Sequence, residues 1–180
     1  RHYCGSSAHH FQNFVIFTNY QFYIDEFVSF CEGLMKDPAK KKYAKGYSAF
    51  VSPNNVVMSN VNDPKSAEEA SGNAEANRMP QMPAYHLKRP DGSGITMINI
   101  GVGPSNAKTI TDHVAVLRPH AWLMLGHCAG LRNSQSLGDY VLAHGYLRED
   151  HILDDDLPSN IPIPPLAEVQ QALEQAVAQV

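Results

Sequence analysis

Long apolar runs, an excess of basic charge and patterned cysteines are all missing from this sequence of 180 residues. A membrane-spanning helix needs about 20 consecutive apolar residues, and no run approaches that length. The formal net charge is −4, which gives no support for binding nucleic acid or an anionic membrane surface. We expect no signal peptide at the start, since a basic, then apolar, then small-residue pattern is not found there. We therefore expect neither a membrane protein nor a nucleic-acid-binding protein.

Metal-binding and redox patterns are missing too. The three cysteines, Cys4, Cys31 and Cys128, have neither metal-ligand nor redox spacing, and an odd count fits a reducing cytoplasm. The nine histidines are scattered and form no zinc motif, so we predict no metal and no cofactor. For Cys128 a buried, unreactive thiol is favoured over a nucleophile, because only His127 is an evident base nearby. The triplet at 154–156 is interpreted as a solvated acidic loop.

The composition is that of a soluble globular protein, with 43% hydrophobic and 18% charged residues. The length suits one compact domain, and we predict a single partial catalytic domain over residues 1–180. The chain begins at Arg1 rather than at methionine, which we interpret as the mark of a piece of a longer protein. Residues 36–80 are the least regular part of the sequence and form a predicted insert or loop region.

Alternating strand and helix patterns predict an α/β fold. We expect strands at 14–17, 95–100, 121–125 and 140–143, with the third buried on both faces. We expect helices after Thr18-Asn19, where Tyr23, Phe27 and Phe30 recur at helical spacing, then at 106–117 and at 166–180. Ser105 is the expected cap of the second helix. Residues 47–58 read as a strand or hairpin interrupted by the turn at 53–55.

Two glycine-bearing loops follow two of the predicted strands, at 101–105 and at 126–130. A strand, helix and strand over 95–125 form a parallel unit, which directs both loops to the same sheet edge, where we expect them side by side. Backbone N–H groups at the N-terminus of a helix that begins at this edge attract anions. Two standard phosphate-binding fingerprints fail, because Ala107 precedes Lys108 and Asn106 stands where a third glycine is needed. By itself, the glycine pair indicates only a tight turn.

Longer segments carry a specific resemblance. They are Met82 to His86, Asn99 to Thr109, Leu117 to Pro119, Trp122 to Cys128, Gly138 to His144 and Ile161 to Pro164, with His10 to Gln12 and Phe17 to Tyr20 upstream. Together these segments resemble the AMP nucleosidase family of the nucleoside phosphorylase superfamily. They cover most of the chain outside residues 36–80.

The resemblance implies a nucleoside-phosphorylase-like mixed sheet flanked by helices, incomplete in this chain, in a cytoplasmic homo-oligomer. It implies that AMP and water react to give adenine and ribose 5-phosphate, through an oxocarbenium-like ribose. The implied substrate-binding residues are Gly101, Gly103, Ser105, Asn106, His127, Cys128, Ala129 and Gly130. Thr18 and Asn19 match a phosphate-holding turn, and His10 matches a residue that reaches across a subunit interface to the sugar.

Two departures from the superfamily pattern qualify this prediction. Phe22 and Met124 stand where many phosphorylases carry phosphate-holding arginines, which favours water as the attacking group. The catalytic acid and the ribose-binding Glu of the family are expected beyond Val180, so the chain alone is predicted to be inactive. Two alternatives stay open: a nucleotide-binding or oligomerising module without catalysis, and a phosphate-dependent nucleoside phosphorylase.

Overall fold

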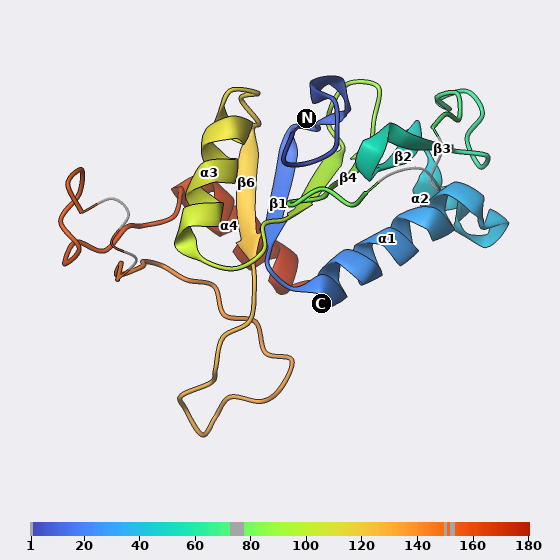
Figure 1. Cartoon of the computed structure of the whole chain (residues 1–180). Helices are drawn as coiled ribbons and strands as arrows, with labels where there is room; N and C mark the ends of the chain where they lie inside the picture. Colours follow the sequence, from blue (N-terminus) through green and yellow to red (C-terminus); the bar gives the residue numbers. More distant parts are fainter. Residues whose placement is uncertain (1, 73–77, 150, 152–153) are drawn as a thin grey trace. The chain divides into compact units, whose positions relative to one another are not determined.

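The computed structural model describes residues 2–72, 78–149, 151 and 154–180 (Figure 1). The chain divides into two compact units, Arg1–Gly126 and His127–Val180. The first unit carries every strand of the sheet.

The first unit is built on one mixed sheet of six strands in the order β3-β2-β4-β5-β1-β6. The strands are β1 (Phe14–Thr18), β2 (Ala49–Ser52), β3 (Val56–Ser59), β4 (Ala84–Lys88), β5 (Ile95–Asn99) and β6 (Ala121–Leu125). β5 and β6 both run parallel to β1, one on each side of it, whereas β4 is antiparallel to β2 and β5. The predicted α/β class and the hairpin at 47–58 are thereby confirmed, with its turn in the short helix η3 (Pro53–Asn55).

Helices cover both faces of this sheet, because alternate strand residues point to opposite sides. On one face, Ile110 and Val114 of α3 (Pro104–Ala115) pack with Val15 and Phe17 of β1. On the other face, α1 (Gln21–Lys36) packs with Met97 and neighbouring residues (Figure 1). Phe30 of the predicted α1 stripe is 52% exposed, and the helix instead buries Ile24, Cys31, Leu34 and Met35.

Four predictions about strands and caps are wrong. β6 is an edge strand with half-exposed side chains rather than a doubly buried one, because β1 takes the inner position between β5 and β6. For the same reason the carboxyl ends of β5 and β6, from which the two glycine loops leave, are not adjacent in the sheet. α3 begins at Pro104 with Gly103 as its cap, two residues before the predicted cap Ser105. The cap of α1 is Tyr20, which follows Thr18-Asn19 and makes no side-chain capping bond.

Residues 36–80 form hydrogen-bonded connections where the structure describes them. They include the short helices η2 (Pro38–Lys40) and α2 (Lys41–Ala44). The buried Asn60 side chain donates to the carbonyls of Ala44 and Tyr47, and the Asn62 side chain donates to those of Leu34 and Asp37. These bonds fix the loop after β3 to the end of α1 and to the start of β2.

The second unit contains α4 (Ala167–Val177), which confirms the predicted C-terminal helix. The predicted strand at 140–143 is wrong: these residues have no regular structure, and Tyr140 and Val141 are more than half exposed. A single bridge, Tyr146 to Ile163, is described in this unit, so a strand at 140–143 has no described partner with which to pair.

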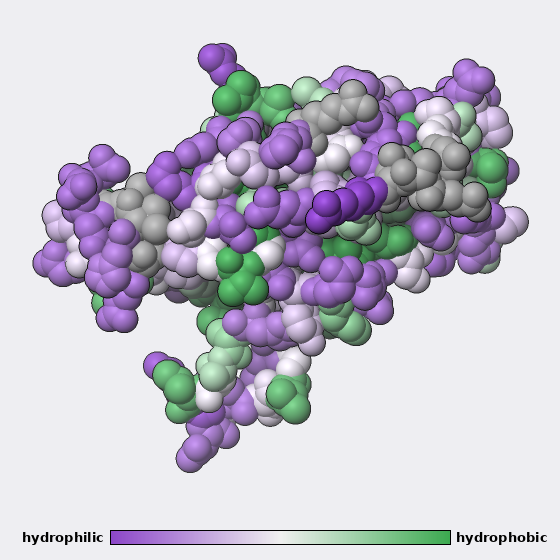
Figure 2. All heavy atoms as spheres, in the orientation of Figure 1, coloured by the Kyte–Doolittle hydropathy of each residue, from purple (hydrophilic) through white to green (hydrophobic). Residues whose placement is uncertain are grey.

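Hydrophilic residues cover most of the face seen in Figure 2, and the hydrophobic residues there form separate patches. Among the described residues, no helix has the length and apolar character needed to cross a membrane.

Candidate active site

Three parallel strands end together at one edge of the sheet, here called the carboxyl edge. The register pairs Thr18, the last residue of β1, with Asn99 of β5 on one side and with Leu125 of β6 on the other. The loop that begins at Gly101 and the turn at Gly126 therefore leave the same edge, as predicted, with β1 between them. Open α/β sheets bind their ligands at this kind of edge.

The loop after β5 exposes backbone to this edge. Gly101 and Gly103 have φ values of +67° and +101°, which glycine tolerates best. The Asn106 side chain donates to the carbonyl of Val102 at 3.1 Å and so holds the loop against α3. Ser105 is exposed in the first turn of α3, where backbone N–H groups have no intrahelical acceptor. The predicted residues of this segment therefore form one open helix start, suited to an anion.

The turn after β1 brings the other predicted pair to the same edge. Thr18 is fully buried, and its Oγ1 accepts the N–H of Tyr20 at 3.2 Å. Asn19 is exposed. α1 starts two residues later at Gln21, so a second helix N-terminus faces this edge.

A side-chain bridge that the sequence did not suggest joins the two segments. The Asn99 side chain donates to Gln21 Oε1 at 3.0 Å, and Asn99 Oδ1 accepts the N–H of Gly101 at 3.0 Å. One amide thus links the end of β5, the glycine loop and the first turn of α1. Only the strand pairing, which makes positions 18 and 99 neighbours, could have indicated this contact.

An aromatic cluster, also missed from the sequence, lies on the first turn of α1. Tyr20, Phe22 and Tyr23 contact one another, with ring centroids 5.5–6.1 Å apart. Tyr20 is 44% exposed and Phe22 is 54% exposed, so these two rings face solvent rather than the core. Neither residues 18–22 nor residues 99–106 include a charged side chain.

His10 is placed away from these residues. It precedes β1 and lies toward the opposite, amino edge of the sheet, where only 3% of it is exposed. Lys88 Nζ is 3.4 Å from His10 Nδ1 and also pairs with Glu68. Within this chain, His10 is therefore not brought to the carboxyl edge.

Neighbouring charges and burial shape the protonation of this amino-edge cluster. Burial, with help from the nearby His9 and Lys88, lowers the pKa of His10 to about 4. His86 is fully buried with Nδ1 2.9 Å from Thr96 Oγ1, and burial holds its pKa well below the usual range. Both rings are neutral at physiological pH, which leaves the Lys88–Glu68 pair as the charged part of the cluster.

Four predicted site residues, His127, Cys128, Ala129 and Gly130, belong to the second unit. All four are exposed there. The prediction of a buried Cys128 is wrong, because this segment has no regular structure and its thiol is exposed. Among the described residues, no group of histidine, cysteine and acidic side chains could hold a metal ion.

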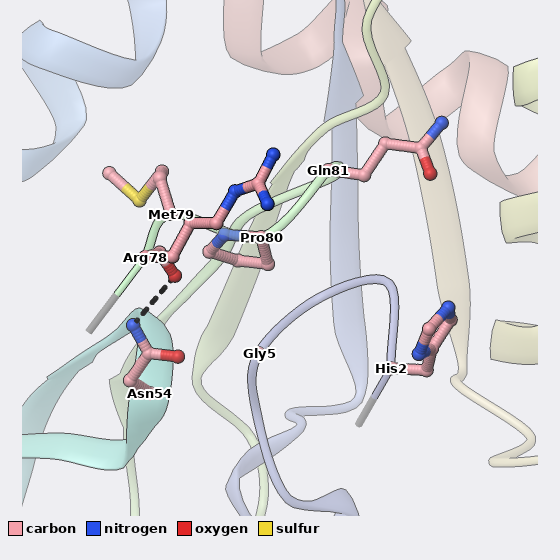
Figure 3. Close-up of a pocket in the computed structure, with 7 residues that line it drawn as sticks. All are labelled: His2, Gly5, Asn54, Arg78, Met79, Pro80 and Gln81. Atoms are coloured by element: carbon pink, nitrogen blue, oxygen red, sulfur yellow. Dashed lines mark hydrogen bonds between the residues drawn. The ribbon is translucent and has the colours of Figure 1, made fainter.

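A separate cavity of about 800 Å³ lies where β2 ends and the chain approaches β4 (Figure 3). His2, Asn54, Arg78 and Gln81 supply its polar groups, and the Asn54 side chain donates to the Arg78 carbonyl at 3.4 Å. β2 runs in the same direction as β5, because both are antiparallel to β4. This cavity therefore lies farther along the carboxyl edge than the glycine loop.

Comparisons with known proteins bear on this edge. No family model matches the sequence. AMP nucleosidases of Escherichia coli K12 and of E. coli O157:H7 are each 54% identical to the chain over 176 residues. The chain closely resembles one part of AMP nucleosidase. The match covers 98% of the chain but 35% of each relative, so the chain spans about a third of the length of these AMP nucleosidases.

Solved structures agree on the fold. A crystal structure of AMP nucleosidase from Bacteroides thetaiotaomicron VPI-5482 has a TM-score of 0.64 and 23% identity, and covers 98% of this chain and 58% of that one. A purine nucleoside phosphorylase from Toxoplasma gondii, in complex with immucillin-H, has a TM-score of 0.64 and 15% identity. The match covers 97% of this chain and 54% of that one. The predicted resemblance and the nucleoside phosphorylase fold are thereby confirmed.

Proposed function

We propose that the chain is part of the catalytic domain of an enzyme that hydrolyses the N-glycosidic bond of AMP to adenine and ribose 5-phosphate. The observation that carries the proposal is 54% identity to AMP nucleosidase along 98% of the chain. The carboxyl edge supports it, because the turn at Thr18-Asn19 and the glycine loop after β5, both predicted to bind substrate, leave the sheet there.

AMP is a dianionic nucleotide with a planar base, and the carboxyl edge offers groups for its anionic end. The N–H groups of the first turn of α3, with the Ser105 hydroxyl beside them, would donate to phosphate oxygens. The left-handed backbone at Gly101 and Gly103 keeps the approach to this turn free of side chains. Asn99 holds this loop to α1 and so positions it for the substrate.

The reaction also needs an acid to protonate the departing adenine. Residues 18–22 and 99–106 contain no acidic side chain, and Gly126 adds none. The acid therefore lies outside these segments, and their part is to bind and orient AMP.

The test uses the protein that carries this chain and follows release of free adenine from AMP. We expect release without added phosphate, and a loss of about tenfold or more in kcat/KM in Gly103→Ala/Ser105→Ala, which removes the Ser105 hydroxyl and strains the loop backbone at Gly103. Tight AMP binding without adenine release would support a binding module instead. Release that requires phosphate would support a phosphorylase.

The proposal includes a cytoplasmic homo-oligomer, in which His10 serves the site of a neighbouring copy. Light scattering of the purified protein checks the oligomeric state. A monomer that hydrolyses AMP would remove this role of His10 while leaving the reaction in place.

A further inference from the structure

A series of three hydrogen bonds joins the glycine loop after β5 to the start of α1. The N–H of Gly101 donates to Asn99 Oδ1 at 3.0 Å, and the Asn99 side chain donates to Gln21 Oε1 at 3.0 Å. The Gln21 side chain in turn donates to Asp25 Oδ1 at 2.8 Å, one helical turn farther along α1. These three bonds, from Gly101 to Asp25, are here called the amide relay.

The two ends of the amide relay fix its direction. A backbone N–H can only donate a hydrogen bond, and a carboxylate can only accept one. Asn99 must therefore turn its amide oxygen to Gly101 and its NH₂ group to Gln21. Gln21 must likewise turn its NH₂ group to Asp25. Because each amide polarises the next, bonds in such a series strengthen one another, and the Asp25 carboxylate decides how both amides are oriented.

The amide relay lies outside the hydrophobic core. Gln21 and Asp25 are exposed and Asn99 is half-buried, so substitutions there should change stability little. The loop that the relay holds contains Gly101 and Gly103, and a glycine loop left free would have to be ordered when a ligand binds. A role in ordering this loop therefore explains the relay better than a role in folding.

We propose that Asp25, Gln21 and Asn99 are positioning residues, whose one-way series of hydrogen bonds orders the glycine loop for the phosphate of AMP. The inference rests on the proposed function. Without the amide relay, AMP itself would have to order the loop, which weakens binding. Because the phosphate lies away from the bond that breaks, losing the relay should raise KM and leave kcat nearly unchanged.

The amide relay also limits which groups can bind the phosphate. The N–H of Gly101 is already donated to Asn99, and Pro104 has no N–H. The N–H groups of Ser105 and Asn106, in the first turn of α3, have no acceptor within the helix. The relay therefore presents Ser105 and Asn106, rather than Gly101, to AMP.

The experiment breaks the amide relay and then rebuilds it in reverse, in the protein that carries this chain. In Asn99→Asp, the new carboxylate still accepts the Gly101 N–H but cannot donate to Gln21. If Gln21 turns over to donate to it, the Gln21 oxygen faces the Asp25 carboxylate. Adding Asp25→Asn supplies an amide that donates to this oxygen, so all three bonds return. Asn99→Asp/Glu26→Gln is the matched control with the same net charge, because Glu26 is an exposed carboxylate next to Asp25 and outside the relay.

Adenine release from AMP gives KM and kcat for each variant. We expect Asn99→Asp to raise KM about tenfold with kcat within about twofold of the unmodified protein, the loss expected of one hydrogen bond to a charged group. Asn99→Asp/Asp25→Asn should bring KM back to within about threefold, whereas Asn99→Asp/Glu26→Gln should not. The midpoint of urea denaturation should be the same in all three variants, which a merely structural role would not give.

An unchanged KM in Asn99→Asp would overturn the inference, and so would recovery in neither double variant or equal recovery in both. If the unmodified protein releases no adenine at all, the proposed function fails. The AMP affinity of the same variants, measured by equilibrium dialysis, then decides the inference: it should fall and recover in the same pattern, and any other pattern overturns it.

Discussion

The two edges of the sheet in the first unit differ in whether their polar groups are buried and hydrogen-bonded or exposed to solvent. At the amino edge, Gln12, His86, Lys88 and Thr96 are buried, and hydrogen bonds join them to each other, to the side chains of His10 and Glu68, or to the backbone. At the carboxyl edge, the helix starts and glycine loop leave backbone N–H groups exposed. Buried groups that are paired stabilise a fold, whereas groups left open to solvent are available to a ligand. The difference predicts that changes at the amino edge alter stability and changes at the carboxyl edge alter activity.

The largest expected effect is at the amino edge, in Gln12→Ala. Gln12 Oε1 accepts the N–H groups of Arg89 and Gly94, and its amide donates to the His10 carbonyl. Removal leaves these buried groups without a partner, so the free energy of unfolding should fall by about 2–4 kcal/mol, measured by urea denaturation. Gln81→Ala, at an exposed glutamine, should change it by less than about 0.5 kcal/mol. Equal losses in the two variants would contradict the contrast between the edges.

The next effect is seen by comparing alanine substitutions at two glycines. Gly103 at the carboxyl edge and Gly46 before β2 have φ values of +101° and +83°, so alanine strains the backbone at both. Each variant should lose about 1–2 kcal/mol of stability. Only Gly103→Ala should also lower kcat/KM for AMP in the folded protein, by about tenfold. A similar loss of activity in Gly46→Ala would place the site elsewhere.

A further effect is a pH dependence of stability that comes from the amino edge. The pKa of His10 is lowered to about 4 in the fold, against about 6.5 in an unfolded chain. Between these values the unfolded state binds more protons, so stability is complete above pH 6.5 and falls as the pH drops toward 4. His86, whose pKa is also lowered by burial, acts in the same direction. Chemical denaturation from pH 7 to 4.5 should show a smaller loss in His10→Asn, and an unchanged slope would exclude His10 as a source.

The sequence predicted the single strands and helices at the carboxyl edge better than it predicted which strands lie next to one another in the sheet. The strand before Gly101 and the helix after it follow from apolar spacing and from glycine and proline at the junction. β4 was missed, because its His86 and Lys88 look unsuited to a buried strand until Thr96 and Glu68 pair with them. β6 was predicted as doubly buried, because strand order depends on which distant strands pair and not on any one segment.

Side-chain contacts between segments at the carboxyl edge could not be predicted from the sequence either. Asn99 and Gln21 are 78 positions apart, and their bond requires β1 and β5 to be neighbours in register. Only the fold reveals that the rings of Tyr20 and Phe22 face outward. The strand at 140–143 failed for the opposite reason: an apolar run forms a strand only where another strand pairs with it.

Hydrogen exchange of the protein that carries this chain, with and without AMP, tests most directly that the carboxyl edge binds the nucleotide. Saturating AMP should slow exchange in peptides that cover residues 18–22 and 101–106, and leave exchange unchanged in those covering residues 86–96. Protection confined to the amino edge, or none at 101–106 while AMP is bound, would contradict the account.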